Sequence, residues 1–293
     1  MGWNSKARKK AEEDRRKEDA RYQERYEEEL KKIQSRKKRP LRDLGVFLIA
    51  ALLLIALGGG IYLFNQSHAT DEAKAITALA DSEGVANGVK VSKLQDGYLL
   101  YEPVSSTHSQ TQDTGVIFYP GGKVESDAYA PLLQKLAAQG VTCVAVTVPF
   151  NLSMLNTNAA DGVAQQVPQV STWYVMGHSL GGVSASSYAA AHTDSVTGCI
   201  FLASYPSDDL SGTGLRTLSI YGTEDGVMNR DNYESAKTLL PADSQEMVIQ
   251  GGNHAQFGNY GKQDHDNDAS ITADDQQQQA VNTIISFLTN VSA

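Results

Sequence analysis

The chain has 293 residues, of which 41% are hydrophobic, and this is enough for one domain of ordinary size together with additional segments. The net charge of −9 is unevenly distributed, because residues 1–43 hold 16 Lys or Arg against 10 Asp or Glu and the rest of the chain is strongly acidic. An acidic body lacks the basic surface that a phosphate backbone requires, so we exclude nucleic acid as a partner.

The two cysteines, Cys143 and Cys199, both lie in apolar runs that are typical of buried strands. We predict two separate buried thiols, since a disulfide requires a narrow geometry. The sequence contains no Cys-x-x-Cys pair and no Cys/His cluster of the kind that binds zinc. The cysteines thus give no indication of a zinc site, and we expect neither a metal nor an organic cofactor.

The first segment, residues 1–43, consists mostly of Lys, Arg, Glu and Gln. Opposite charges at helical spacings favour a helix, but the apolar stripe is too thin to be buried in a core. We predict a charged cytoplasmic arm, either a solvated helix or partly disordered. The alternative is a short coiled coil or a docking arm for a cytoplasmic partner.

Residues 44–64 form an uncharged run, LGVFLIAALLLIALGGGIYLF. A helix of this length matches the hydrocarbon core of a bilayer, about 30 Å thick. Basic residues precede the run and acidic residues follow it, which predicts a single-pass cell-membrane protein with a cytoplasmic N-terminus and an extracytoplasmic body. The alternative is a signal peptide cleaved after Ala69, although the basic arm before the run is long for such a peptide.

Residues 65–114 are expected to hold a short helix followed by a hairpin. The helix is predicted over residues 67–82. Residues 89–94 and 98–101 then flank Gln95-Asp96-Gly97, and Asp-Gly between two apolar stretches is a strong hairpin signal.

Residues 115–293 alternate between apolar strand-like runs and helical segments. Continuously apolar strands separated by helices predict an α/β domain with a mostly parallel central sheet and helices on both faces. The predicted strands are 115–119, 142–148, 172–176, 198–203, 217–221 and 246–249, and the predicted helices are 126–139, 180–192, 233–240 and 273–289.

A Gly-x-Ser-x-Gly pattern, Gly177 to Gly181, follows the third of these strands and opens the next helix. This strand–turn–helix context is the one that a nucleophilic serine on a strained turn requires, because side chains two positions away would collide. The turn exposes the Ser179 hydroxyl. It also directs the first free N–H groups of the helix at the reacting carbonyl.

A serine nucleophile needs a general base, and the base needs an orienting carboxylate. Asp225, which follows the predicted strand 217–221, is our choice for the carboxylate, and Glu224 is the alternative. His254, which follows the strand 246–249, is our choice for the base. Both positions lie at the carboxyl edge of a parallel sheet, where open α/β sheets build their sites. We therefore predict the catalytic set Ser179, Asp225 and His254.

The loop after strand 115–119 contains Pro120, Gly121, Gly122 and Lys123. Glycine allows the backbone to approach a tetrahedral oxygen closely. We predict that the oxyanion donors are the N–H groups of Leu180 and Gly122, with Lys123 as an alternative to Gly122.

Four segments together resemble the α/β-hydrolase superfamily: IFYPGGKVESDAYAPL (117–132), GHSLGG (177–182), YGTEDG (221–226) and GGNHAQFGNYG (251–261). Residues 115–293 look most like small, lidless bacterial members related to dienelactone hydrolases. The resemblance implies hydrolysis of an ester or lactone by Ser179, Asp225 and His254. Dienelactone hydrolases use a cysteine nucleophile, so the serine here puts their substrate in doubt.

These features predict a membrane-anchored serine hydrolase that cleaves a carboxylic ester or lactone through an acyl-enzyme. The expected partners are a small-molecule ester and, through residues 44–64, the membrane. The alternatives are an acyltransferase acting on cell-surface sugars or lipids, a non-catalytic binding module with the same fold, and a membrane scaffold that functions through its charged arm.

The acidic run at 264–268 and Asp275 partly match a calcium-binding loop. Ala269 replaces the turn glycine of that loop, and its terminal glutamate is replaced by aspartate. We favour a solvated acidic loop that leads to a helix, with Thr272 as N-cap and Asp275 three residues on.

Overall fold

The computed structural model describes residues 3–64, 66–104, 111 and 113–290. The chain divides into two compact units, Met1–Asn65 and Gln66–Ala293, which are described separately.

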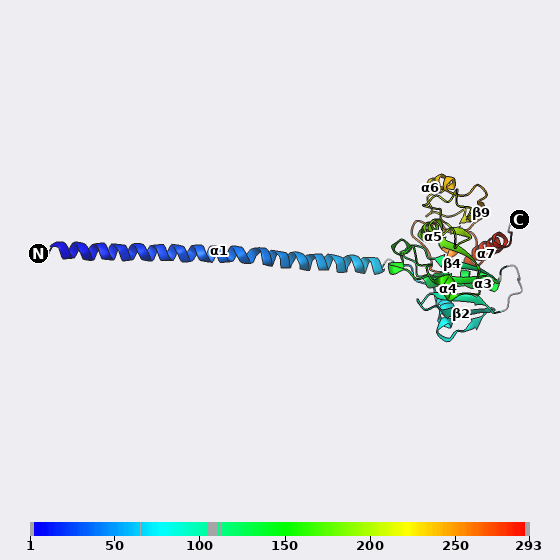
Figure 1. The fold of residues 1–293 in the computed structure, drawn as a ribbon, viewed down its shortest axis with the longest axis horizontal. Coiled ribbons are helices and arrows are strands. Elements are labelled where there is room, and N and C mark those ends of the chain that lie inside the picture. The colour runs from blue at the N-terminus through cyan, green and yellow to red at the C-terminus, as the bar shows by residue number, and fades with distance from the viewer. Residues whose placement is uncertain (1–2, 65, 105–110, 112, 291–293) are drawn as a thin grey trace. The chain divides into compact units, whose positions relative to one another are not determined.

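The first unit is a single helix, α1, Trp3–Phe64 (blue in Figure 1). Its side chains at positions 8–35 are all exposed. Ion pairs one turn apart stabilise this part, with 2.8 Å between Lys17 Nζ and Glu13 Oε1 and 3.8 Å between Arg16 Nη2 and Glu12 Oε1.

The structure contradicts the predicted single-pass membrane localisation. Within the part of the chain that the structure describes, no helix is both long and apolar enough to cross a membrane. The described stretch 8–35 of α1 is dominated by charged side chains, which are costly to place in hydrocarbon. Most side chains of the apolar run 44–64 lie outside the described residues.

The second unit contains a nine-stranded sheet with the strand order β1-β2-β3-β5-β4-β6-β7-β8-β9. The strands β1 to β3 form an antiparallel meander whose last member pairs antiparallel with β5, and all pairs from β5 to β9 are parallel. The strands are β1 Val85–Ala86, β2 Val89–Lys93, β3 Leu99–Pro103, β4 Thr114–Tyr119, β5 Thr142–Ala145, β6 Thr172–His178, β7 Gly198–Leu202, β8 Arg216–Gly222 and β9 Gln245–Ile249.

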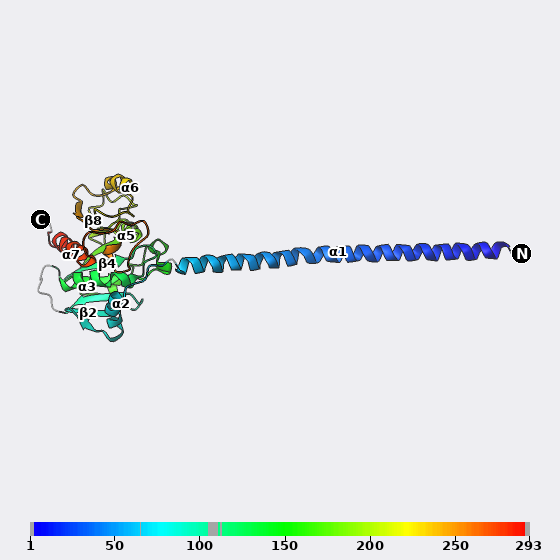
Figure 2. The same ribbon diagram turned by 180° about the vertical axis from the view of Figure 1, so that it is seen from behind.

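Helices cover both faces of this sheet, as can be followed in the opposite views of Figures 1 and 2. The α-helices are α2 Asp71–Thr77, α3 Ala130–Ala138, α4 Val163–Gln166, α5 Leu180–Ala191, α6 Arg230–Ala236 and α7 Ala273–Thr289. The 3₁₀ turns are η1 Ala78–Ser82, η2 Ser126–Tyr129, η3 Pro149–Asn151, η4 Ser153–Leu155, η5 Lys237–Leu239 and η6 Ala255–Phe257.

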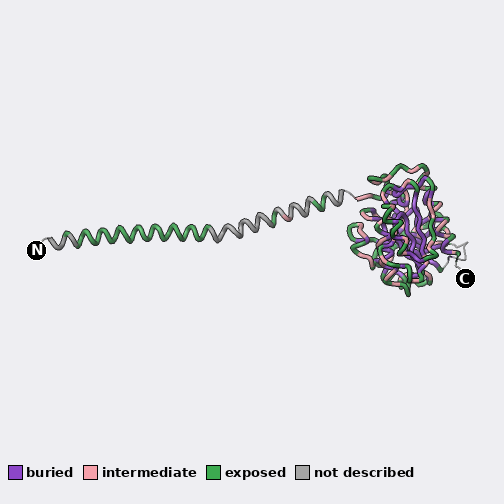
Figure 3. The backbone as a smooth tube through the Cα atoms, turned by 90° about the horizontal axis from the view of Figure 1, so that it is seen from above, coloured by how far each residue is buried: buried purple, intermediate pink, exposed green. Residues whose placement is uncertain are grey.

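Successive side chains of the central strands point to opposite faces of the sheet, so the two apolar cores lie on opposite faces. Val116 and Phe118 of β4 belong to the core formed with α2, α3 and α7, whereas Ile117 and Tyr119 belong to the core formed with α4 and α5. The buried residues accordingly fill the interior of this unit (purple in Figure 3). A sheet buried on both faces explains why its strands are continuously apolar in the sequence.

Several local predictions are confirmed. The hairpin is formed by β2 and β3, α7 has the predicted bounds, and the Thr272 side chain caps α7 by accepting the N–H of Asp275. Cys143 and Cys199 are both free and buried, on β5 and β7 respectively. The strand predicted at 142–148 ends early, at Ala145, and the strand predicted at 172–176 continues to His178.

The parallel strands direct four loops to one edge of the sheet. Ser179 follows β6, Asp225 follows the end of β8, His254 follows the end of β9, and Gly122 follows β4. Because the carboxyl ends of parallel strands meet at one edge, residues that are far apart in sequence are brought together there.

Close packing between β6 and the start of α5 leaves no room for a side chain at Gly177. A Cβ at this position would lie 2.2 Å from the carbonyl carbon of Gly181. At Gly212, by contrast, a Cβ would meet nothing within 4 Å.

We predict that Gly177→Ala lowers the free energy of unfolding by about 2–4 kcal/mol, because the added methyl group forces the strand and the helix apart. The matched change Gly212→Ala should stay within about 0.5 kcal/mol of the wild type. Urea unfolding of the three proteins measures both values, and equal stabilities would contradict the proposed packing.

Candidate active site

Ser179 lies on a strained turn between β6 and α5. Its backbone has φ 52° and ψ −125°, a conformation that non-glycine residues rarely adopt. The turn is fixed on both sides of the serine, since the Ser179 N–H donates to the Leu202 carbonyl at 3.0 Å and the Ser204 hydroxyl donates to the Ser179 carbonyl at 2.6 Å. Both hydrogen bonds hold the Ser179 backbone in place, and Ser179 lines a cavity.

The side chains of Asp225 and His254 form a buried hydrogen-bonded pair. His254 Nδ1 lies 2.9 Å from Asp225 Oδ2, and the side chains are 1% and 0% exposed respectively. Asp225 Oδ1 accepts the N–H groups of Val227 at 2.9 Å and Met228 at 2.8 Å. The carboxylate can only accept from Nδ1–H, so His254 Nε2 is left as the acceptor for another proton.

Two opposing effects act on the pKa of Asp225. Burial raises this pKa. The hydrogen bond and charge interaction with His254, together with the two backbone N–H groups, lower the pKa by more than burial raises it, so the net shift is downward. Asp225 is therefore ionised at neutral pH and can stabilise a positively charged imidazole.

Of the two carboxylates considered from the sequence, Glu224 has a different partner. Its Oε1 accepts the hydroxyl of Thr223 at 3.0 Å. The choice between two adjacent acids depends on the direction that each side chain takes after β8, which the sequence alone does not determine.

Ser179 and His254 line the same cavity, which has a volume of about 340 Å³. His254 Nε2 is buried and has no hydrogen-bond partner among the described residues. The lining residues are Gly122, Ser179, Leu180, Val183, Ala203, Ser204, Tyr205, Val227, Met228, Asn229, His254 and Gln263. Most of the lining is apolar or uncharged, so it suits a neutral ligand of modest size.

The backbone of the loop after β4 has two of its N–H groups already engaged. The Gly121 N–H donates to the Tyr129 hydroxyl at 3.0 Å, and the Lys123 N–H donates to the Asn151 carbonyl at 2.7 Å. Gly122 lies between these two residues and lines the cavity. The Leu180 side chain packs close to it, so that a Cβ on Gly122 would lie only 2.5 Å from Leu180 Cδ1. The engaged N–H disfavours Lys123 as an oxyanion donor.

A buried network connects this loop to the histidine. His178 Nε2 donates to the carbonyl of His254 at 3.1 Å, and His178 Nδ1 lies 2.8 Å from the Tyr129 hydroxyl. Burial and the neighbouring His254 hold the pKa of His178 well below its usual value, so the ring is neutral and its Nδ1 accepts the Tyr129 proton. The role of His178 and Tyr129 cannot be predicted from the sequence, because neither residue carries a local motif for it.

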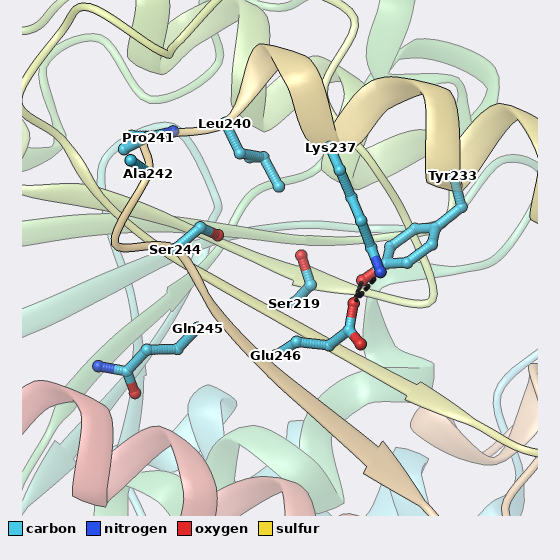
Figure 4. A pocket seen from close by; sticks show the side chains of 9 residues that line it. All are labelled: Ser219, Tyr233, Lys237, Leu240, Pro241, Ala242, Ser244, Gln245 and Glu246. Carbon is cyan, nitrogen blue, oxygen red and sulfur yellow. Dashed lines mark hydrogen bonds and ion pairs between the residues drawn. The ribbon is translucent and has the colours of Figure 1, made fainter.

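A second cavity, of about 350 Å³, lies beside β8, β9 and α6, and none of Ser179, Asp225 and His254 lines it (Figure 4). The charged groups of this cavity pair with each other, since Glu246 Oε2 accepts from Lys237 Nζ at 2.8 Å and from the Tyr233 hydroxyl at 2.5 Å. The cavity beside Ser179 is therefore the stronger candidate for a reaction site.

Three of the four acids in the calcium-like pattern have separate partners. Asp268 pairs with Lys262, Asp275 takes part in the capping of α7, and the carboxylate of Asp266 accepts backbone N–H groups. Among the described residues, no three His, Cys, Asp or Glu side chains are grouped so that they could hold a metal ion.

A mostly parallel sheet with a serine on a strained strand-to-helix turn at its carboxyl edge defines the α/β-hydrolase class of fold. A model of the alpha/beta hydrolase family matches residues 115–279. The match spans more than half of the chain, so the chain belongs to this family. No curated protein matches the sequence.

The chain is similar to several solved structures at low sequence identity. A bacterial membrane phospholipase A, described as a virulence factor, has 12% identity and a TM-score of 0.50 over 84% of this chain and 99% of its own. A putative lipase from Acinetobacter baumannii AYE has 11% identity and a TM-score of 0.50 over 75% and 97%. Est1E from Butyrivibrio proteoclasticus has 14% identity and a TM-score of 0.47 over 69% and 100%.

We predict that Tyr129→Phe lowers the free energy of unfolding by about 1–3 kcal/mol, because it leaves the buried Gly121 N–H and His178 Nδ1 unpaired. Tyr101→Phe is a matched control, since the Tyr101 hydroxyl is buried and has no partner among the described residues. Its removal should be neutral or stabilising. Urea unfolding would contradict the network if the two variants lost equal stability.

Proposed function

We propose that this protein is a serine hydrolase that cleaves a carboxylic ester or lactone through an acyl-enzyme. The observation that carries the proposal is the buried Asp225–His254 pair. His254 Nε2 has no hydrogen-bond partner among the described residues, and His254 and Ser179 line the same cavity. Family membership supports the hydrolase class. The serine nucleophile and the acyl-enzyme are our inference from the site.

In the first step, Ser179 Oγ attacks the carbonyl carbon of the ester while His254 Nε2 takes its proton. The positive charge that forms on the imidazole is stabilised by Asp225. The negative charge that forms on the carbonyl oxygen is stabilised by hydrogen bonds from the N–H groups of Gly122 and Leu180. The structure shows no hydrogen bond between Ser179 Oγ and His254 Nε2, and such bonds often form only when substrate is bound.

Collapse of the tetrahedral intermediate breaks the bond to the leaving oxygen, which receives the proton from His254 Nε2. Water then enters, loses a proton to the same nitrogen and attacks the acyl-enzyme. The second collapse releases the carboxylic acid and returns the proton to Ser179 Oγ. One nitrogen thus serves as base and acid in each half of the reaction.

The cavity favours a neutral substrate with a short acyl group. Its lining contains no Asp, Glu, Lys or Arg side chain, and Val183, Val227 and Met228 supply apolar surface. All of the residues assigned to the reaction lie between positions 122 and 254, so we assign catalysis to the unit Gln66–Ala293.

Treatment of the full chain with a fluorophosphonate probe tests the proposal. We expect covalent labelling of the wild type and loss of labelling in Ser179→Ala, with ester turnover reduced by at least about 10⁴-fold. Ser195→Ala is the matched control, because Ser195 is exposed in the turn that follows α5 and its substitution should leave labelling unchanged.

Equal labelling of the wild type and Ser179→Ala would place the nucleophile elsewhere. A folded wild type that neither reacts with the probe nor hydrolyses esters would contradict the serine-hydrolase proposal as a whole.

A further inference from the structure

Asp266 lies in the acidic loop 264–268, but its carboxylate is turned toward the backbone of the candidate site. Its Oδ1 accepts the N–H of Gly226 at 3.0 Å and the N–H of His254 at 3.3 Å. Its Oδ2 accepts the N–H of Ala255 at 2.9 Å. One carboxylate thus accepts the N–H groups of Gly226, which follows Asp225, of His254 itself and of Ala255, which follows His254.

The loop around Asp266 approaches Gly226 so closely that a side chain there would not fit. A Cβ on Gly226 would lie 2.6 Å from the His265 carbonyl oxygen and 3.0 Å from the Asn267 nitrogen. On the other side, Asn253 Nδ2 donates to the Asn267 carbonyl at 2.8 Å. The acidic loop is therefore packed against both of the loops that present Asp225 and His254.

Different hydrogen bonds fix different parts of the two loops that present Asp225 and His254. Asp225 is oriented within its own loop by the N–H groups of Val227 and Met228. Nearer the strands, the two loops are joined by the Glu224 N–H, which donates to the Gly252 carbonyl at 2.8 Å. Beyond that point, Asp266 bonds both loops at the residues next to the reacting side chains.

We propose that Asp266 is a positioning residue that holds the loop of Asp225 and the loop of His254 in register for proton transfer. This inference rests on the proposed function, because it acts through the Asp225–His254 pair. A carboxylate suits the task, since it accepts several N–H groups at once and an ionised acceptor binds an N–H group more strongly than a neutral one. A displacement of about 1 Å in a catalytic group can cost about 10²-fold in rate.

The test measures ester hydrolysis and the rate of fluorophosphonate labelling in Asp266→Asn and Asp266→Ala, with the full chain. We expect Asp266→Ala to lower kcat and the labelling rate by at least about 10-fold with KM within twofold, because the base is misplaced while the cavity is retained. Asp266→Asn keeps one acceptor oxygen and should fall between Asp266→Ala and the wild type. Asp264→Asn, an exposed acid in the same loop, is the matched control and should keep the wild-type rate.

A double-mutant cycle separates positioning from general stabilisation. If Asp266 acts through the catalytic pair, Asp266→Ala should change kcat by less than about twofold once Asp225→Asn is present, because residues that act as a unit are not additive. An undiminished effect of Asp266→Ala in that background would overturn the proposal.

Gly226→Ala provides a second route if the Asp266 variants do not fold, because it displaces the acidic loop while Asp266 itself is unchanged. It should lower kcat at constant KM in the same way. Wild-type rates in a folded Asp266→Ala or Gly226→Ala protein would overturn the positioning role. Absence of labelling in the wild type would instead contradict the proposed function.

Discussion

The hydrogen bond between Asp225 and His254 is the interaction on which the candidate site depends. It joins the ends of β8 and β9 inside a region that excludes water, where a lost partner would leave an unpaired charge. Its geometry leaves the second imidazole nitrogen without a hydrogen-bond partner among the described residues, and His254 lines the same cavity as Ser179. The proposed chemistry requires this nitrogen, and the strained turn at Ser179 is useful only in its presence.

The surrounding structure fixes the two ends of this site by different means. On the side of the base, Asp266 and Asn253 connect the acidic loop to the catalytic loops. On the side of the expected oxyanion, Tyr129 and His178 connect the Gly121 backbone to the His254 carbonyl. Both connections are made by polar groups that contact backbone atoms, and such contacts position a reacting group without touching the substrate.

Features that depend on a local sequence pattern could be predicted from the sequence. Contacts between residues that are far apart in the chain could not. The alternation of strands and helices and the Gly-x-Ser-x-Gly turn were readable because each is encoded within a few residues. Tyr129 meets His178 across 49 residues and Asp266 meets Gly226 across 40, so no local pattern reveals either contact. The membrane span predicted for residues 44–64 is not supported by the described residues.

The most direct test of the central claim is to trap the acyl-enzyme. The full chain would be mixed rapidly with p-nitrophenyl butyrate, quenched in acid and analysed by intact-mass and peptide mass spectrometry. Our account predicts a butyryl group on the peptide that contains Ser179, and no such adduct in Ser179→Ala. A butyryl group on another residue, or wild-type turnover by Ser179→Ala, would contradict it.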